Sequence, residues 1–155
     1  EAPRAACDAV YLPGGYPDLH AETLSNAGRF ISGVRSAAAR GALIYGECGG
    51  YMVLGEVLVD ADGTRHPMIG LLSHSTSFAK KQMHLGYRSI TPEPNPVWKA
   101  PLRGHEFHSC SIVAQPDAPL AEVGDADGNT VPETGSHRGP VSGTFFHLIT
   151  AEDSL

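Results

Sequence analysis

The feature that most constrains the fold of this chain is a cysteine flanked by glycines at residues 46–50, Gly-Glu-Cys-Gly-Gly. Residues 42–45 before it form an apolar run that suits a strand, and residues 51–54 after it form an apolar run that suits a helix. Small neighbours permit a sharp strand-to-helix turn that exposes the cysteine, and a helix N-terminus favours its thiolate. The segment therefore predicts an enzyme with Cys48 as a covalent nucleophile, although a lone cysteine is more commonly a buried structural residue.

Length and composition indicate one globular domain and exclude several classes of function. The chain has 155 residues, 41% of them hydrophobic, which is enough for a buried core. A net charge of -6 argues against a nucleic-acid partner, and no apolar run is long enough to span a membrane. The three cysteines include no CxxC pair, which is typical of free thiols, so we expect a cytoplasmic protein. The chain opens on Glu1 rather than on methionine, which favours a segment of a longer protein.

The first third of the chain alternates strand-like and helix-like runs. Residues 8–12 suit a buried strand that ends in the turn Pro13-Gly14-Gly15. Apolar residues then recur at helical spacing from Leu24 to Ala38, and Gly41 suits a left-handed helix cap. This order predicts an α/β layer with a parallel sheet.

The second half consists mainly of predicted strands and turns. We expect strands at residues 57–59, 68–72, 85–90, 109–113 and 142–149. The aspartate- and glycine-rich segments 60–63 and 125–129 are similar to parts of calcium loops. Because both lack the remaining ligands, hairpin turns explain them better.

Two further features would complete a cysteine site. A nucleophilic thiol needs a general base, and His147 lies in a late apolar strand that could direct its imidazole at Cys48. On the residues alone, a buried core histidine explains His147 equally well. Acyl chemistry through a thiol also needs two backbone N–H donors for the oxyanion, which Gly15 and Gly49 can supply.

Residues 103–108, Arg-Gly-His-Glu-Phe-His, bring four ionisable groups together. A metal site is one interpretation, but no HExxH or CxxC pattern accompanies His105 and His108, so we expect no metal. Placement of a polar or anionic substrate, or a polar strand edge, explains the segment better. The chain also has no P-loop, so we expect no nucleotide cofactor within it.

Several motifs occur in an order that identifies a family resemblance. They are residues 12–20 (Leu-Pro-Gly-Gly-Tyr-Pro-Asp-Leu-His), 45–52 (Tyr-Gly-Glu-Cys-Gly-Gly-Tyr-Met), 85–88 (Leu-Gly-Tyr-Arg), 103–108 and 145–148 (Phe-Phe-His-Leu). Together they resemble the class I glutamine amidotransferase domain of the cobyrinic acid type, over nearly the whole chain. The resemblance implies an α/β fold, a flavodoxin-like three-layer sandwich with a mainly parallel sheet.

The resemblance also implies where this domain begins. It covers residues 1–155 as one glutaminase domain, truncated at its N-terminus because the family's first β-α-β unit is missing. Loss of that unit would leave the parallel sheet with an unpaired edge, which self-association into a homo-oligomer would cover.

The implied activity is a glutaminase. Cys48 would form a glutamyl thioester with glutamine, His147 would transfer the proton, and Gly15 and Gly49 would hold the oxyanion. Many relatives carry a glutamate two residues after the catalytic histidine, where this chain has Ile149. The resemblance therefore implies a dyad of Cys48 and His147.

Other residues are implied in supporting roles. A backbone carbonyl or a group such as Glu106 would orient the imidazole of His147. Arg88 is similar to a residue that binds the α-carboxylate of glutamine in related glutaminase subunits. His105 and Glu106 are further candidates for substrate binding.

The resemblance implies a partner for the released ammonia. An N-terminal ATP-dependent synthetase domain of the same chain would bind ATP and magnesium. It would amidate the a and c carboxylates of a corrin ring in cobalamin biosynthesis. Alternatives are the glutaminase part of cobyric acid synthase, a cell-wall precursor amidating enzyme, an inactive docking domain, and a cysteine hydrolase of the same fold that does not use glutamine.

Overall fold

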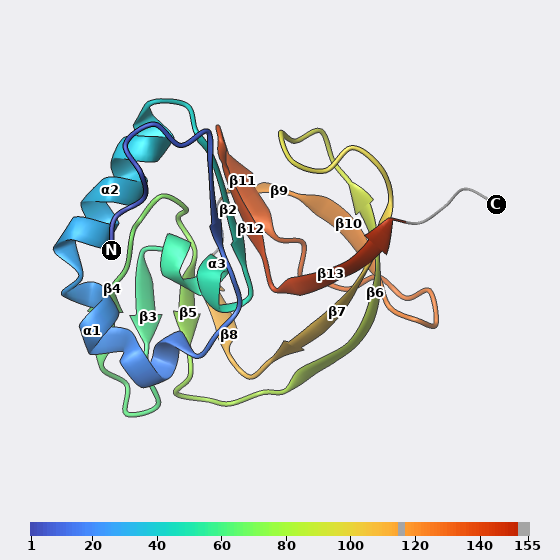
Figure 1. Cartoon of the computed structure of the whole chain (residues 1–155). Helices are drawn as coiled ribbons and strands as arrows, with labels where there is room; N and C mark the ends of the chain where they lie inside the picture. Colours follow the sequence, from blue (N-terminus) through green and yellow to red (C-terminus); the bar gives the residue numbers. More distant parts are fainter. Residues whose placement is uncertain (115–116, 152–155) are drawn as a thin grey trace.

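A computed structural model describes residues 1–114 and 117–151 of the chain. Figure 1 shows that the helices gather at the N-terminal side of the molecule, whereas the later part of the chain is built from strands. Within the described residues, no helix has the length and apolar character needed to cross a membrane.

The central sheet has five strands in the order β1-β2-β12-β11-β9. Strands β1 (Ala9–Leu12), β2 (Leu43–Glu47) and β12 (Val141–Thr144) run parallel. Strands β11 (Ser136–Arg138) and β9 (Ala118–Pro119) extend the sheet in antiparallel fashion. The predicted α/β class is confirmed, with the parallel pairing of this sheet confined to its first three strands and β1 at one edge.

The helices lie between and beside the first strands. The short helix η1 (Pro17–His20) leads into α1 (Ala21–Ser25), and α2 (Gly28–Ala39) provides the crossover between β1 and β2 that a parallel pair needs. The single helix predicted from Leu24 to Ala38 is wrong, because Ala27 has a ψ of 57° and interrupts the helical backbone. The predicted cap is confirmed, since Gly41 follows α2 with a φ of 89°.

A second sheet carries the C-terminal half. Its antiparallel order is β10-β6-β7-β13, formed by β10 (Ala121–Gly124), β6 (His84–Pro92), β7 (Leu102–His108) and β13 (Phe146–Ala151). A third, small sheet has the order β4-β3-β5-β8. Its strands are β4 (Arg65–Pro67), β3 (Val57–Val59), β5 (Ser75–Ser77) and β8 (Ser111–Ala114). Both predicted turns, at residues 60–63 and 125–129, are closed by backbone hydrogen bonds.

Two predicted strands are corrected. Residues 68–72 are not a strand: they form a loop whose backbone N–H groups donate to carbonyls of residues 53–56. The side chains of Met68, Ile69 and Leu72 are buried, which explains the apolar character of the segment. The strand predicted at 142–149 is two strands, β12 in the central sheet and β13 in the second sheet. The chain changes sheets at Phe145, which is fully buried and packs against Tyr51 and His108.

Helix α3 (Gly49–Leu54) lies at the centre of the core. All its residues are buried, and the Tyr51 hydroxyl shares a 2.8 Å hydrogen bond with the hydroxyl of Ser136 in β11. The close approach of α3 to the sheet depends on glycine. A Cβ atom at Gly50 would lie 2.0 Å from the carbonyl oxygen of Leu12, whereas one at Gly28 in the first turn of α2 would meet no atom within 4 Å.

These two glycines give a matched test of the packing. Gly50→Ala should lower the free energy of unfolding by roughly 2 kcal/mol or more, because backbone atoms of β1 must move to admit the methyl group. Gly28→Ala should be neutral or stabilising by up to about 1 kcal/mol, since alanine is the better helix former. Thermal unfolding of the two variants measures the difference. Equal stability of both variants would contradict the close packing of α3 on β1.

Candidate active site

Cys48 sits on a strained turn between β2 and α3. It has a φ of 50° and a ψ of -106°, and among the described residues it is the one non-glycine residue with positive φ. Its backbone N–H donates a 2.8 Å hydrogen bond to the carbonyl of Thr144, which ties the turn to β12. A Cβ atom at Gly46 would lie 2.7 Å from the carbonyl oxygen of Gly50, so the glycines are required for the turn. The predicted strand, turn and helix are confirmed.

The groups predicted to act with Cys48 converge on it. A Cβ atom at Gly14 would lie 2.9 Å from Cε1 of His147 and 3.5 Å from the Cβ of Cys48. One at Gly49 would lie 2.8 Å from the backbone nitrogen of Gly15. Three segments far apart in the sequence, the 14–15 turn, the elbow itself and the strand that carries His147, therefore meet at this point.

Cys48 and His147 line a common cavity of about 500 Å³, a volume in the range of small-molecule sites. The glycines of the 14–15 turn line it too. Its remaining lining residues are Tyr16, Asp18, Met52, Phe78, Met83, Phe107, His108 and Ser109. The cavity therefore joins a thiol and an imidazole to a polar backbone turn and several apolar side chains.

The thiol of Cys48 is neutral in this resting state. Burial raises its pKa to about 11, the backbone N–H of Gly49 lowers it in part, and the nearby carboxylate of Glu47 raises it further. Its Sγ donates a weak hydrogen bond of 3.8 Å to the carbonyl of Phe107. The expected effect of the helix start is present, because the N–H of Gly49 in the first turn of α3 lowers the pKa, but desolvation by burial outweighs it.

The imidazole of His147 is held by a carboxylate that the sequence prediction did not name. Its Nδ1 lies 3.2 Å from Oε1 of Glu47, and the Tyr11 hydroxyl donates a 3.3 Å hydrogen bond to the same oxygen. Glu106 was predicted as a possible partner of His147, and this is wrong. Glu106 pairs across the sheet with Phe146, so its side chain lies on the opposite face from His147.

Glu106 instead forms a buried network with its neighbours. Its Oε2 accepts a 2.7 Å hydrogen bond from Arg88, and its Oε1 lies 2.8 Å from Nε2 of His108. Burial alone would raise the pKa of Glu106, but the hydrogen bonds from His108 and Arg88 outweigh it and hold the pKa below its usual value. Glu106 is therefore an ionised group neutralised by Arg88.

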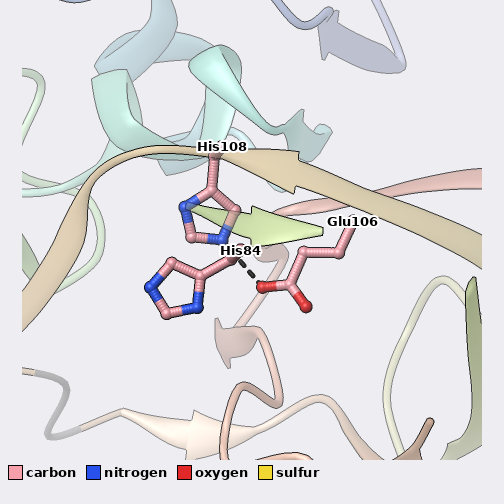
Figure 2. A group of neighbouring side chains, drawn as sticks. All are labelled: His84, Glu106 and His108. Atoms are coloured by element: carbon pink, nitrogen blue, oxygen red, sulfur yellow. Dashed lines mark hydrogen bonds and ion pairs between the residues drawn. The ribbon is translucent and has the colours of Figure 1, made fainter. Parts of the chain in front are cut away.

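Figure 2 shows how His84, Glu106 and His108 lie together, with the His84 ring against that of His108. The two rings stack with centroids 4.7 Å apart and an interplanar angle of 10°. One ligand atom from each residue lies within 4.8 Å of the others. The guanidinium of Arg88 already supplies the positive charge beside Glu106. The expectation that no metal binds to this group of His84, Glu106 and His108 stays a prediction.

The predicted substrate-binding residues lie away from the thiol. Arg88 and Glu106 line a neighbouring cavity of about 770 Å³, and His108 lines both cavities. His105 packs against Tyr87 with ring centroids 5.5 Å apart. The structure brings together Cys48, His147 and the 14–15 turn, whereas Arg88 and Glu106 lie beyond His108.

The site residues that the sequence prediction missed include Glu47, Tyr11 and Phe107. A carboxylate next to a nucleophilic cysteine is a visible signal, since Glu47 lies inside the Gly-Glu-Cys-Gly-Gly motif. Tyr11 and Phe107 carry no such signal, because their place at the site depends on how separate strands pair.

Solved proteins share this fold. A glutamine amidotransferase from Thermotoga maritima has a TM-score of 0.59 at 17% identity and covers 95% of this chain and 58% of its own. The PurLQS structure from the same organism has a TM-score of 0.60 at 18% identity and covers 95% of this chain and 71% of its own. The fold is therefore that of the class I glutamine amidotransferases.

Residues 1–155 match the CobB/CobQ-like glutamine amidotransferase domain, and the chain belongs to this family. It is 57% identical over 150 residues to hydrogenobyrinate a,c-diamide synthase of Brucella anthropi, covering 96% of this chain and 34% of that protein. The protein of the same name from a Sinorhizobium species is 59% identical over 150 residues, with 96% and 35% covered. The chain thus spans about a third of the length of these curated relatives.

The raised pKa of Cys48 predicts how fast the free protein is alkylated. The rate of iodoacetamide labelling at Cys48 should keep rising, about tenfold per pH unit, from pH 7 to about pH 10, because only the thiolate reacts. Mass spectrometry of the Cys48 peptide measures the rate separately from Cys7 and Cys110. A rate that is already at its plateau at neutral pH would show that the thiolate is preformed.

Proposed function

We propose that this chain is the glutaminase domain of a corrinoid a,c-diamide synthase. The observation that carries the proposal is the cavity in which Cys48, on a strained elbow, faces His147 and the 14–15 turn. More than half of the residues are identical to proteins named hydrogenobyrinate a,c-diamide synthase, which supports the same assignment. Because hydrogenobyrinate is the cobalt-free corrinoid, these names favour a cobalt-free acceptor.

The first half of the reaction forms a thioester. Nδ1 of His147 is occupied by Glu47, which leaves Nε2 for the proton of Cys48. As that proton moves, Sγ attacks the side-chain amide carbon of glutamine, and the amide oxygen becomes an oxyanion. The N–H groups of Gly15 and Gly49 hold this oxyanion. Collapse of the intermediate breaks the C–N bond, and His147 returns the proton to the departing ammonia.

The second half releases glutamate. His147 takes a proton from water, the resulting hydroxide attacks the thioester carbon, and Cys48 leaves and regains its proton. Because the pKa of Cys48 is raised to about 11, the thiol is almost entirely protonated at neutral pH. Deprotonation is therefore coupled to attack on bound glutamine rather than completed beforehand.

The ammonia has a destination outside this chain. Relatives about three times as long leave room for the ATP-dependent synthetase domain that the family resemblance implies. That domain would bind ATP and magnesium, activate the a and c carboxylates of the corrin ring, and accept the ammonia. Arg88 and Glu106 remain candidates for substrate binding from the neighbouring cavity once both domains are in place. His105, on the other face of the sheet, remains a candidate as well.

The central test replaces the nucleophile in the full-length synthase. Cys48→Ser should abolish glutamine-dependent amidation, by roughly three orders of magnitude or more, while amidation with added ammonium salt continues. Mass spectrometry of the corrinoid product measures both reactions. Cys7→Ser, outside the cavity, is the matched control and should retain both. Loss of both reactions in Cys48→Ser alone would assign this cysteine another role.

A reactive glutamine analogue gives an independent test. A diazo-ketone analogue should alkylate Cys48, because the thiol attacks the electrophilic carbon that occupies the amide position. The label is located by mass spectrometry, and excess glutamine should protect against it. A folded, full-length enzyme that acquires no label at Cys48 would overturn the nucleophile assignment.

A further inference from the structure

His147 lacks the carboxylate that a residue two positions later would supply. That residue is Ile149, an apolar side chain that is 60% exposed and cannot accept a hydrogen bond. A general base needs a fixed tautomer and orientation, which a hydrogen bond to its second nitrogen provides. The hydrogen bond that the structure gives the His147 side chain is the one from Nδ1 to Glu47.

Glu47 is held rigidly for this purpose. It is the last residue of β2, where it pairs with Thr144 of the neighbouring strand β12. Its side chain is 14% exposed, and its Oε1 also accepts the hydrogen bond from Tyr11. The Tyr11 ring in turn stacks on Tyr45, with centroids 6.0 Å apart. The carboxylate therefore has a fixed place beside the imidazole.

From these contacts we propose that Glu47 is the positioning residue of the site, orienting His147 and stabilising its protonated form during catalysis. This inference rests on the glutaminase function proposed above. Glu47 takes the part of a third catalytic-triad member but comes from the residue before the nucleophile, on β2, rather than from the strand that carries the histidine. Cys48 and Glu47 are adjacent, so one elbow positions both the nucleophile and the carboxylate.

The charge of Glu47 has two opposite effects. It disfavours a free thiolate on Cys48, which is its immediate neighbour. It favours the imidazolium that forms when His147 accepts the proton, through a direct contact. The proton thus stays on sulfur until glutamine binds, and the ion pair between Glu47 and His147 forms as the thiol attacks.

The other titratable groups near His147 come from several elements. On β7, His105 is its cross-strand partner. Cys48 on the elbow, His108 at the end of β7, Asp18 on η1 and Tyr16 before η1 line the same cavity. The carboxylate of Glu106 lies on the far face of the same sheet, with Arg88. Glu47 is the carboxylate that lies in hydrogen-bond contact with the imidazole of His147.

The test uses Glu47→Gln and Glu47→Ala in the full-length synthase. The variant Glu47→Gln keeps a hydrogen-bond acceptor at this position and loses the charge, whereas Glu47→Ala loses both. We expect kcat of glutamine hydrolysis to fall about tenfold in the first and about a hundredfold in the second, with KM within about threefold. A fall in kcat at nearly constant KM marks a positioning role, because a merely structural role would also disturb the binding of glutamine.

The controls separate this inference from the function on which it rests. Glu22→Gln, an exposed carboxylate on α1, should hydrolyse glutamine at the wild-type rate, and amidation with ammonium salt should continue in every variant. If wild type itself releases no glutamate from glutamine, the proposed function fails. If wild type is active and Glu47→Ala keeps kcat within twofold, or if KM rises as much as kcat falls, the role of Glu47 is overturned.

Discussion

The close contact between the first turn of α3 and the ends of β1 and β2 is the constraint on which this structure depends. Gly46 and Gly50 let the backbones touch, and Cys48 adopts its strained conformation between them. Because α3 is also the centre of the core, the packing energy of buried residues such as Tyr51 and Leu54 maintains that strain. Fold stability and the placement of the nucleophile therefore have the same physical origin.

The second determinant is the change of sheet at Phe145. Strand β12 pairs with β2, and its Thr144 carbonyl accepts a hydrogen bond from the N–H of Cys48. The next strand, β13, belongs to the second sheet, where it pairs with β7. Buried Phe145 fixes the bend by packing against Tyr51 and His108. The imidazole of His147 is thereby brought from a separate sheet to the elbow, on the face opposite to Glu106.

Local chemistry made the elbow, the two hairpin turns and the Gly41 cap predictable from sequence, and the ordered motifs identified the family. Longer-range relations were not available from the sequence. The alternation of side chains along β7 put Glu106 and Arg88 on the far face from His147, which requires knowledge of the strand register. Desolvation of Cys48 depends on the folded cavity, so the resting thiol could not be inferred from a helix N-terminus alone.

The central claim is that glutamine is hydrolysed through a thioester on Cys48 with His147 as the base. Rapid acid quenching of the full-length protein during turnover with glutamine, followed by peptide mass spectrometry, tests it most directly. The account predicts a glutamyl group attached to the Cys48 peptide, lost again as glutamate is released. Release of glutamate with no acyl group on Cys48, or with one on another residue, would contradict it.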